Sequence, residues 1–382
     1  MKLLDICEAI VDCPHSTAKD EGNGYPLIRT PNVGKGRLKL AGVHRVSENV
    51  YNLRNERAVP QVDDLILARE APVGNVAIIR QGQRVCLGQR TVLIRPNKKC
   101  VDPDFLVYYL LSPELQHKLM SSANGATVSH LNMSYIRSLE VQVPDIEVQK
   151  RIGAILARID DKIELNNAIN ENLESQAQAI FKSWFVDFEP FGGVMPEDWK
   201  IGMIKDIIEL HDSKRIPLSG SEREKMDKIY PYYGATSCMD YVDNYIFDGK
   251  YLLLGEDGTV IDKNGYPILQ YVEGKFWVNN HAHIITGKLG YTVEILYLLF
   301  KQTNVKHIVT GAVQPKISQA NLKKVPVTIP NIKDLDAFNN IIQPIFAMIR
   351  KNRNENEKLA LLRDTLLPKL MNGEIDVSEV KI

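Results

Sequence analysis

The chain has 382 residues, of which 44% are hydrophobic and 25% are charged, so it is long enough for several domains and has the composition of a soluble globular protein. Its 47 basic and 47 acidic residues give a net charge of zero, and nothing indicates disorder. No run approaches the roughly 18 apolar residues of a membrane span and no signal peptide is evident, so we expect a cytoplasmic protein without a membrane partner. The five cysteines (Cys7, Cys13, Cys86, Cys100 and Cys238) lack paired short spacing, which favours free thiols over disulfides or a zinc site.

Residues 1–144 alternate short β-type runs with turn residues, which predicts an α+β domain. We expect strands at 25–31, 64–69, 76–79, 91–94 and 139–143, and helices at 104–112 and 113–121. This part is mildly basic, with 18 Lys and Arg residues and 14 Asp and Glu residues. Residues 69–99 contain seven basic residues and a single acidic one, Glu70. Such a cluster can bind phosphate, although a solvated strand face explains the charge equally well.

Residues 145–190 carry the longest uninterrupted helical period in the chain. Apolar or amide side chains recur every three or four positions and form one narrow seam: Ile152, Ile155, Ile159, Ile163, Asn166, Asn170, Leu173, Ala177, Ile180 and Trp184. A seam this narrow predicts one partner helix. The segment has 5 basic against 9 acidic residues, so we expect it to span DNA rather than to lie along phosphates.

The partner helix appears when the sequence is compared with itself at an offset of 186 residues. The seam then recurs at Phe338, Ile341, Ile345, Ile349, Asn352, Asn356, Leu359, Arg363, Leu366 and Leu370. The preceding loop and strand repeat as well, because Gly125, Leu131, Ile136, Leu139, Val141, Val143 and Pro144 correspond to Gly311, Ile317, Leu322, Val325, Val327, Ile329 and Pro330. The chain is therefore expected to contain a duplicated plan: domain 1–144, helix 145–190, domain 191–330, and helix with tail 331–382.

The second copy differs from the first at a proline. Pro344 takes the place of Arg158, so we expect the second helix to kink there or to restart with Pro344 in its first turn, and to end near Pro368 and Gly373. The rest of residues 199–330 follows the first domain's core: 65–74 resembles 252–258, and 90–96 resembles 281–287.

Two asparagines interrupt each seam, Asn166 with Asn170 and Asn352 with Asn356. A buried amide on an apolar seam needs a partner and penalises slipped pairings, so these residues are predicted to determine the register of the helix pair. The alternative is that they face solvent where the helices diverge.

Formal matches to catalytic motifs fail on their context. Asp145, Asp160 and Lys162 have the spacing of a nuclease motif that is built on strands, but here the last two lie within the predicted helix. No Walker loop or dinucleotide-binding glycine motif is present, so the chain is expected to bind neither ATP nor a dinucleotide. We predict a binding protein with no catalytic residue, no metal and no cofactor of its own.

In the order and spacing of these features the chain resembles the specificity subunit of type I restriction-modification systems, over essentially its whole length. The resemblance rests on the duplicated junctions 125–144 and 311–330, on Gln149-Lys150-Arg151-Ile152 and Ile163-Glu164-Leu165-Asn166, on residues 195–199, and on Leu367-Pro368-Lys369-Leu370-Met371-Asn372-Gly373-Glu374.

The resemblance implies an α+β fold with two similar target recognition domains, separated by two long antiparallel coiled-coil helices in a pseudo-twofold repeat. Each domain would read one half of a split double-stranded DNA target through the major groove, and the helices would determine the spacer. Two methyltransferase subunits and the restriction (translocase) subunits would be partners. S-adenosylmethionine, ATP and Mg²⁺ would belong to those partners.

The family does not specify which residues read bases, so physical reasoning selects them. Arginine pairs with guanine and an amide with adenine, which favours Arg69, Gln89 and Arg90 for bases in the first domain, with Arg29, Lys35 and Arg37 on phosphates. In the second domain the base candidates are Tyr232, Tyr233, Asn279, Asn280, His281 and His283, with Lys214, Arg215 and Lys316 on the backbone. Two alternatives remain open: a metal-dependent enzyme centred on His281 and His283, and a helical scaffold that never touches DNA.

Overall fold

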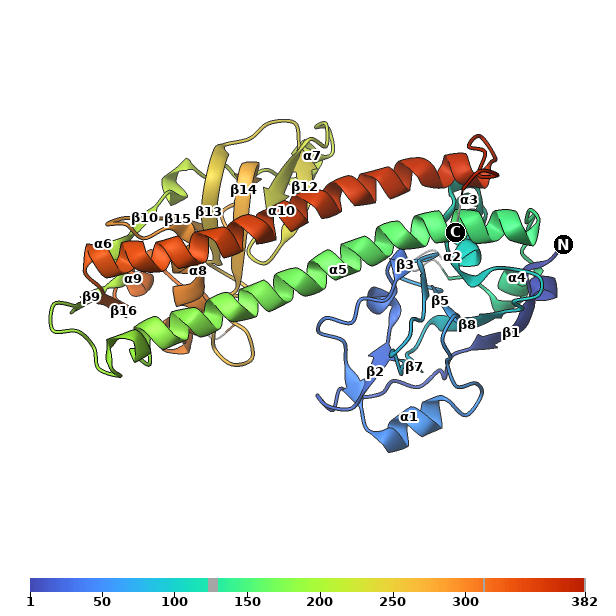
Figure 1. Cartoon of the computed structure of the whole chain (residues 1–382), viewed down its shortest axis with the longest axis horizontal. Helices are drawn as coiled ribbons and strands as arrows, with labels where there is room; N and C mark the ends of the chain where they lie inside the picture. The colour runs from blue at the N-terminus through green and yellow to red at the C-terminus, as the bar shows by residue number, and fades with distance from the viewer. Residues whose placement is uncertain (123–129, 312, 381–382) are drawn as a thin grey trace. The chain divides into compact units, whose positions relative to one another are not determined.

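Residues 1–122, 130–311 and 313–380 are described by the computed structural model (Figure 1). Gly125, which belongs to the predicted repeat junction, lies outside them. The chain divides into unit 1, residues 1–166 with 353–382, and unit 2, residues 167–352. Both divisions fall inside the two long helices, so each unit consists of one α+β domain together with one half of each helix.

Unit 1 contains a five-stranded sheet in the order β1-β8-β5-β6-β3 and a three-stranded sheet in the order β4-β2-β7. The strands are β1 (Cys7–Asp12), β2 (Tyr25–Ile28), β3 (Gly36–Arg37), β4 (Arg45–Val46), β5 (Leu65–Ala68), β6 (Val76–Ile78), β7 (Cys86–Leu87) and β8 (Thr91–Pro96). The helices are η1 (Leu3–Ile6), η2 (Thr30–Asn32), α1 (Glu48–Arg54), α2 (Pro103–Leu111), α3 (Pro113–Ser121) and α4 (Met133–Ser138). Strands β5 and β6 are buried on both faces, which explains why they show no polar alternation.

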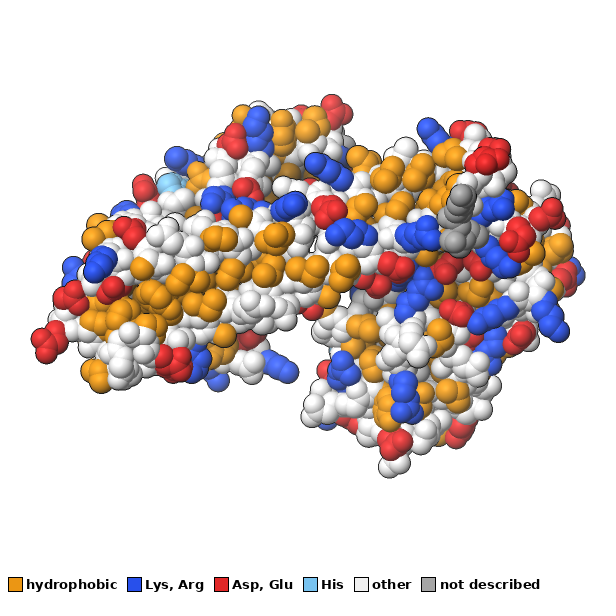
Figure 2. Space-filling view, in the orientation of Figure 1, with side chains coloured by type: hydrophobic (Ala, Val, Ile, Leu, Met, Phe, Trp, Pro, Cys, Tyr) orange, Lys and Arg blue, Asp and Glu red, His pale blue; other side chains and the backbone are white. Residues whose placement is uncertain are grey.

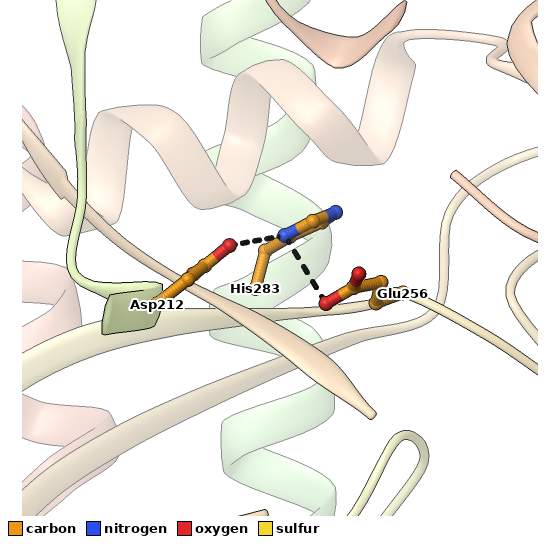
Figure 3. Close-up of side chains that lie close together, drawn as sticks. All are labelled: Asp212, Glu256 and His283. Carbon is orange, nitrogen blue, oxygen red and sulfur yellow. Dashed lines mark hydrogen bonds and ion pairs between the residues drawn. The ribbon is translucent and has the colours of Figure 1, made fainter. Parts of the chain in front are cut away.

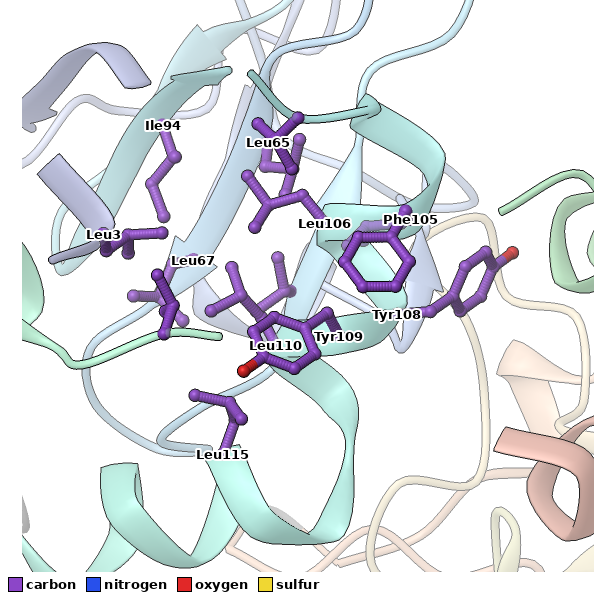
Figure 4. Packing of buried hydrophobic residues seen from close by; sticks show 14 of the residues in the cluster. Leu3, Leu65, Leu67, Ile94, Phe105, Leu106, Tyr108, Tyr109, Leu110 and Leu115 are labelled. Atoms are coloured by element: carbon purple, nitrogen blue, oxygen red, sulfur yellow. The ribbon is translucent and has the colours of Figure 1, made fainter. Parts of the chain in front are cut away.

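Helix α2 covers the core of unit 1. Asp102 caps its N-terminus by accepting a hydrogen bond from the backbone of Phe105, and Pro103 occupies the first turn, where no N–H donor is needed. The helix buries Phe105, Leu106 and Leu110 against Leu65, Leu67 and Ile94 of the sheet (Figure 4). This apolar layer is what holds α2 on the sheet.

Residues 139–143 do not form the predicted strand. Among the described residues they pair with the chain start through a single bridge, Lys2 to Glu140. Leu139 and Val141 are nevertheless buried, so their alternation with polar residues reflects packing against the core and not pairing in a β-sheet. In unit 2 the equivalent segment is a true strand, β16 (Pro326–Ile329), which pairs with β9 (Lys200–Met203).

Unit 2 contains a six-stranded sheet in the order β10-β15-β13-β14-β11-β12. Its strands are β10 (Ile208–Leu210), β11 (Tyr230–Tyr233), β12 (Cys238–Val242), β13 (Phe247–Gly255), β14 (Leu269–Val278) and β15 (Ala282–Gly287). Its shorter helices are η3 (Glu189–Phe191), α6 (Ile204–Ile207), η4 (Asp212–Lys214), α7 (Gly220–Arg223), α8 (Val293–Gln302), η5 (Lys306–Ile308) and α9 (Gln319–Leu322).

The two sheets share one core plan. In unit 1 Ile94 of β8 pairs with Ile10 of β1 and Leu65 of β5, and in unit 2 Ile285 of β15 pairs with Leu210 of β10 and Leu252 of β13. A parallel pair follows in each unit, β2 with β7 and β11 with β14. The predicted repeat of two similar α+β domains is confirmed at the level of strand register.

The two long helices are α5 (Ile146–Phe185) and α10 (Ile332–Met371), each of 40 residues. They run antiparallel, because in unit 1 Asp160 contacts Arg363 while Asn166 contacts Asn356. Every predicted seam residue of α5 is buried or half-buried. In unit 2 Phe181, Trp184 and Phe185 surround the buried ring of Phe338.

The predicted restart of the second helix at Pro344 is wrong. Helix α10 begins at Ile332 and continues through Pro344, and it also contains Pro368 before ending at Met371. Packing of Phe338, Ile342, Phe346 and other apolar side chains on both sides of the proline holds the helix together despite the missing hydrogen-bond donor. Gly373, with a positive φ of 77°, follows the end of the helix, where a left-handed residue is favoured.

None of the helices in the described part of the chain combines the length and the apolar character that crossing a bilayer requires.

Candidate nucleic-acid interface

In each unit several loops meet at the ends of the central strands, and we call this region the loop edge. In unit 1 it comprises residues 28–29, 69–70, 88–90 and 130–131, and in unit 2 residues 233–234, 256–257, 279–281 and 316–317. Three backbone hydrogen bonds connect the loops of unit 1: Gly88 N to Ile28 O (2.7 Å), Arg69 N to Arg90 O (2.8 Å) and Leu131 N to Arg69 O (3.2 Å).

The same three connections recur in unit 2: Asn279 N to Tyr233 O (3.0 Å), Glu256 N to His281 O (2.8 Å) and Ile317 N to Glu256 O (2.8 Å). The loop edges are therefore structurally equivalent. Gln89 and Arg90 in unit 1 occupy the positions of Asn280 and His281 in unit 2, so each edge presents an amide followed by a cation or an imidazole.

Arg69 lies beneath the loop edge of unit 1 rather than on it. The residue is 5% exposed, and its guanidinium donates to Leu131 O (2.8 Å), to Asp12 Oδ1 (2.7 Å) and to His130 Nε2 (2.6 Å). The predicted base contact is corrected, because a guanidinium with these partners supports the loops and cannot reach a base without leaving them.

Arg90 is the exposed cation of this edge. Its side chain is 57% exposed, its Nε lies 2.8 Å from Glu70 Oε2, and its backbone has a left-handed φ of 66°. The other oxygen of Glu70 lies 2.6 Å from His130 Nδ1. Glu70 therefore connects the exposed arginine to the buried network of Arg69.

The remaining predicted residues of unit 1 divide into surface and interior positions. Gln89 is half-buried and donates to His15 O at 2.7 Å. Arg29 is half-buried, and its Nε has no hydrogen-bond partner among the described residues. Lys35 is exposed. These positions leave the predicted DNA contacts of the three residues untested.

Arg37 does not have the phosphate-facing position that we predicted. It is 8% exposed and donates to Asp161 Oδ1 (2.7 Å), to the hydroxyl of Tyr108 (3.3 Å) and to Ala157 O (3.2 Å). The preceding Gly36 has a φ of 90°, and a Cβ there would lie 2.6 Å from Asp160 Oδ2. The glycine therefore allows the backbone to approach α5, and the arginine fastens the domain to that helix.

At the loop edge of unit 2 the buried charge has the opposite sign. Glu256 stands where unit 1 has Arg69, and its oxygens lie 2.6 Å from Arg215 Nη1 and 3.2 Å from Lys316 Nζ. Burial raises the pKa of Glu256, but the hydrogen bond from Arg215, the charge of His283 and the hydrogen bond from Lys316 outweigh it and hold the pKa below its usual value. Arg215 is thus committed to Glu256, whereas Lys316 stays exposed.

His281 occupies the position of Arg90. Its Nδ1 is paired with Asp257, its side chain is 44% exposed, and its backbone N–H donates to Asn279 Oδ1 at 2.8 Å. Asn280, which precedes His281 in the sequence, is exposed. Lys214, in the short helix η4, is exposed as well. Together with Lys316, these are the accessible members of the predicted set in unit 2.

His283 is buried and fully engaged. Its Nδ1 lies 2.6 Å from Asp212 Oδ2 and 3.7 Å from Glu256 Oε2 (Figure 3). Its Nε2 lies 2.7 Å from Ile317 O, so both ring nitrogens face acceptors. Burial raises the pKa of Asp212, but hydrogen bonds from His283 and the backbone of Ile284 lower it below its usual range. The predicted base contact of His283 is therefore corrected to a structural role.

Asp212, Glu256 and His283 also form the one group with metal-ligand spacing found among residues 1–122, 130–311 and 313–380. Arg215 and Lys316 already neutralise Glu256, so an added cation would have to displace two others. His281 is paired separately with Asp257. The arrangement does not support the alternative of a metal-dependent enzyme centred on His281 and His283.

Two further base candidates of unit 2 are interior residues. Tyr232 is 1% exposed, its hydroxyl accepts a hydrogen bond from Leu218 N (3.0 Å), and Arg223 covers its ring. Asn279 is buried, and its amide holds His281 N and Met239 Sδ. Both predictions are corrected, since these side chains organise the loop edge from below. Tyr233 is half-buried against Phe276.

Sequence reasoning missed the acids of both edges, Glu70 and Asp257, and the imidazole of His130. A signal for Glu70 was present, because it is the only acid among the seven cations of residues 69–99. The other two lie at sequence positions that no local pattern distinguishes, and they become neighbours of the edge only through strand pairing.

The asparagines of the helix pair contact one another. In unit 1 Asn166 Nδ2 donates to Asn356 Oδ1 at 2.9 Å, and in unit 2 Asn352 Nδ2 donates to Asn170 Oδ1 at 2.9 Å. Asn166 and Asn352 are buried, so the alternative in which the asparagines simply face solvent is not supported. Their predicted effect on register remains a prediction.

Comparison with known proteins agrees with this architecture. The family model described as the type I restriction modification DNA specificity domain matches residues 1–175 and 196–362. The type I restriction enzyme MjaIX specificity subunit of Methanocaldococcus jannaschii is 26% identical, with 97% of this chain and 88% of that protein covered. The type I restriction enzyme HindI specificity subunit of Haemophilus influenzae is 25% identical, with 92% and 95% covered.

The fold is also similar to that of a solved structure, the S subunit of a type I restriction-modification system from M. genitalium. The TM-score is 0.53 at 16% sequence identity, and 97% of this chain and 95% of that chain are covered. The family model and the two similar specificity subunits define the molecule as a DNA-recognition subunit without catalytic activity of its own. It belongs to the family of type I restriction-modification specificity subunits.

Proposed function

We propose that each loop edge reads one half of a bipartite double-stranded DNA target through the major groove. The observation that carries this proposal is the equivalence of the two edges, each of which has an amide residue next to an accessible cation or imidazole on a supported loop. Amide and guanidinium groups are the side chains that match base edges in that groove. Lys35, Lys214 and Lys316 are exposed cations suited to phosphates.

The helix pair is proposed to determine the spacer between the half-sites. Each helix has 40 residues, which corresponds to roughly 60 Å at 1.5 Å per residue. One turn of B-DNA is about 34 Å, so a helix of this length exceeds the distance between adjacent major-groove faces. The acidic balance of residues 145–190 supports a helix that spans the duplex without lying on phosphates.

The partners are proposed to be two methyltransferase subunits, with restriction (translocase) subunits joining them. Ile341 and Met348 of α10 are exposed, and in Figure 2 hydrophobic side chains gather over the long helices of unit 2. Exposed apolar groups on a helix favour a protein partner. S-adenosylmethionine, ATP and Mg²⁺ would be bound by the partner subunits, and the assembly would work in the cytoplasm.

Methylome sequencing of cells that express this chain with its methyltransferase partner tests the proposal. The expected result is one bipartite motif with a constant spacer, absent when this chain is omitted. Methyl transfer or cleavage by the isolated chain would contradict its assignment as a recognition subunit. Binding to duplex DNA should also weaken steeply with salt, and salt-independent or undetectable binding by the assembled complex would favour the scaffold alternative.

A further inference from the structure

The two loop edges differ chemically at one equivalent position, Arg90 and His281. We propose that these residues read bases, that Glu70 and Asp257 are their positioning residues, and that the bases differ in kind. Arg90 reads a guanine, and His281 reads a base with an exocyclic amino group, adenine or cytosine. This inference rests on the proposed function and names the determinants within it.

Glu70 holds the guanidinium of Arg90 through the Nε atom. Glu70 Oε2 lies 2.8 Å from its Nε, and among the described residues no hydrogen bond is recorded for its terminal nitrogens. An arginine anchored through Nε keeps two terminal N–H groups for a pair of acceptors. In the major groove, O6 and N7 of guanine form that pair.

The orientation of Glu70 is determined by the interior of unit 1. Arg69 can only donate, so the 2.6 Å contact between its Nη2 and His130 Nε2 requires that nitrogen to accept. The ring proton is then on Nδ1 and is donated to Glu70 Oε1 at 2.6 Å. A chain of hydrogen bonds therefore runs from Asp12 through Arg69 and His130 to Glu70, and an ion pair continues it from Glu70 to Arg90.

The imidazole of His281 is held in a comparable way. A carboxylate accepts hydrogen bonds, so Nδ1–H of His281 donates to Asp257, and in a neutral imidazole Nε2 is then an acceptor. The donors that bases present in the major groove are N6 of adenine and N4 of cytosine. Substituting an imidazole for a guanidinium at the equivalent position thus changes the preferred base from one that accepts to one that donates.

The backbone of Arg90 favours a role for its side chain outside the fold. Its φ of 66° lies in the left-handed region, which glycine adopts without strain. The side chain is exposed and fills no part of the core. A strained residue with an exposed, oriented guanidinium is the pattern expected where recognition requires a particular side chain.

The test is methylome sequencing of the complex carrying Arg90→Gly, Glu70→Gln, His281→Ala or Asp257→Asn, one at a time. Arg90→Gly and Glu70→Gln should relax one guanine in one half-site, with a loss of discrimination of roughly tenfold, and leave the other half-site unchanged. His281→Ala and Asp257→Asn should relax an adenine or cytosine in the other half-site. Arg84→Ala and His307→Ala, at exposed positions away from both edges, are matched controls that should leave the motif intact.

The outcomes separate this inference from the proposed function. If the wild-type complex yields no bipartite motif, the proposed function fails. If the wild-type motif is clear but survives all four variants, or if Arg90→Gly relaxes a base other than guanine, only the base assignment fails. A Glu70→Gln variant that has the melting temperature of the wild type but loses the preference for guanine would show that Glu70 positions Arg90. If that variant unfolds, Arg90→Gly still tests the base assignment, because glycine adopts the left-handed backbone at this position without strain.

Discussion

Asn166 donates a hydrogen bond of 2.9 Å to Asn356 across the helix pair, and every polar atom of its amide has a partner. Nδ2 also donates to Glu355 Oε2 at 2.9 Å, and Oδ1 accepts from Lys162 Nζ at 2.9 Å. At the offset of the repeat, Asn352 donates to Asn170 in the same way. Each unit thus contains one asparagine pair between the helices, and in unit 1 the seam residue Arg363 also pairs with Asp160.

We expect Asn166→Ala to lower the free energy of unfolding by about 1–3 kcal/mol, because it removes buried hydrogen bonds and leaves partners unsatisfied. Chemical denaturation measures the change, and a double-mutant cycle with Asn356→Ala should give a coupling of at least about 0.5 kcal/mol. Asn340→Ala, at an exposed site on α10, is the control and should change little. Strict additivity in the cycle would rule out the pair as a contributor to register.

Arg37→Ala should destabilise unit 1 by about 1–3 kcal/mol, since it removes a buried side chain together with its hydrogen bonds, while its ion-pair partner Asp161 is 59% exposed and stays hydrated. The affected groups are Asp161, the hydroxyl of Tyr108 and the carbonyl of Ala157. Lys35→Ala, two residues away on the exposed surface, should stay within about 0.5 kcal/mol of the wild type. Equal effects of the two substitutions on thermal melting would refute the structural role of Arg37.

Arg90→Gly should leave stability unchanged or raise it by up to about 1 kcal/mol, because it relieves a left-handed backbone strain. The lost contact with Glu70 involves a side chain that is more than half exposed and contributes little. Arg90→Val should lower the melting temperature, since a β-branched residue tolerates this conformation poorly. A glycine variant that melts well below the valine variant would contradict this prediction.

Stability of unit 2 should fall in acid through Glu256. Its pKa in the folded state lies below the ordinary value of 4.5, so the ionised carboxylate stabilises the fold above that pH. The stabilisation is lost as the pH falls below 4.5 through the folded-state pKa. Melting temperatures measured at intervals from neutral pH down to about pH 3 should show this loss in the wild type.

Glu256→Gln is the matching variant. It should already be less stable at neutral pH, because Arg215 and Lys316 lose their shared carboxylate, and its melting temperature should depend less on pH in the acid range. Glu224→Gln, at an exposed site in unit 2, is a control for the removal of a carboxylate. A wild type and a Glu256→Gln variant with parallel pH profiles would show that Glu256 makes no such contribution.

Much of the fold was predictable because the spacing of apolar residues along the sequence indicates its long helices and its repeat. The helices predicted at 104–112 and 113–121 agree with α2 and α3 to within about two residues, the usual uncertainty of helix ends. The helix predicted at 145–190 begins at Ile146 but ends earlier, at Phe185. Its copy near the C-terminus is also a long helix, but the predicted seam residue Ile341 is exposed and Ile342 is buried instead. The family resemblance is confirmed as well. Of the two outcomes expected at Pro344, the restart is wrong, because local propensity does not include the packing of Phe338 and Phe346 that holds the helix through it, and the kink stays a prediction.

The candidate site was only partly predictable. Residue type directed attention to Gln89 and Arg90 and to Asn280 and His281, which the structure places at equivalent positions, while their contacts with DNA stay predictions. It could not separate exposed from buried polar groups, so Arg37, Arg69, Tyr232, Asn279 and His283 were assigned to DNA although they lie inside. A buried arginine and a surface arginine look alike in sequence when their partners are tens of residues away.

The reversal of charge between Arg69 and Glu256 limits how loops could be exchanged between the two halves of the chain. Arg69 is neutralised by Asp12, whereas Glu256 is neutralised by Arg215 and Lys316. A glutamate transplanted alone to position 69 would stand beside Asp12, and an arginine transplanted to position 256 would stand beside Arg215. A graft that alters the target of one half would therefore have to carry the supporting ions along with the exposed residues.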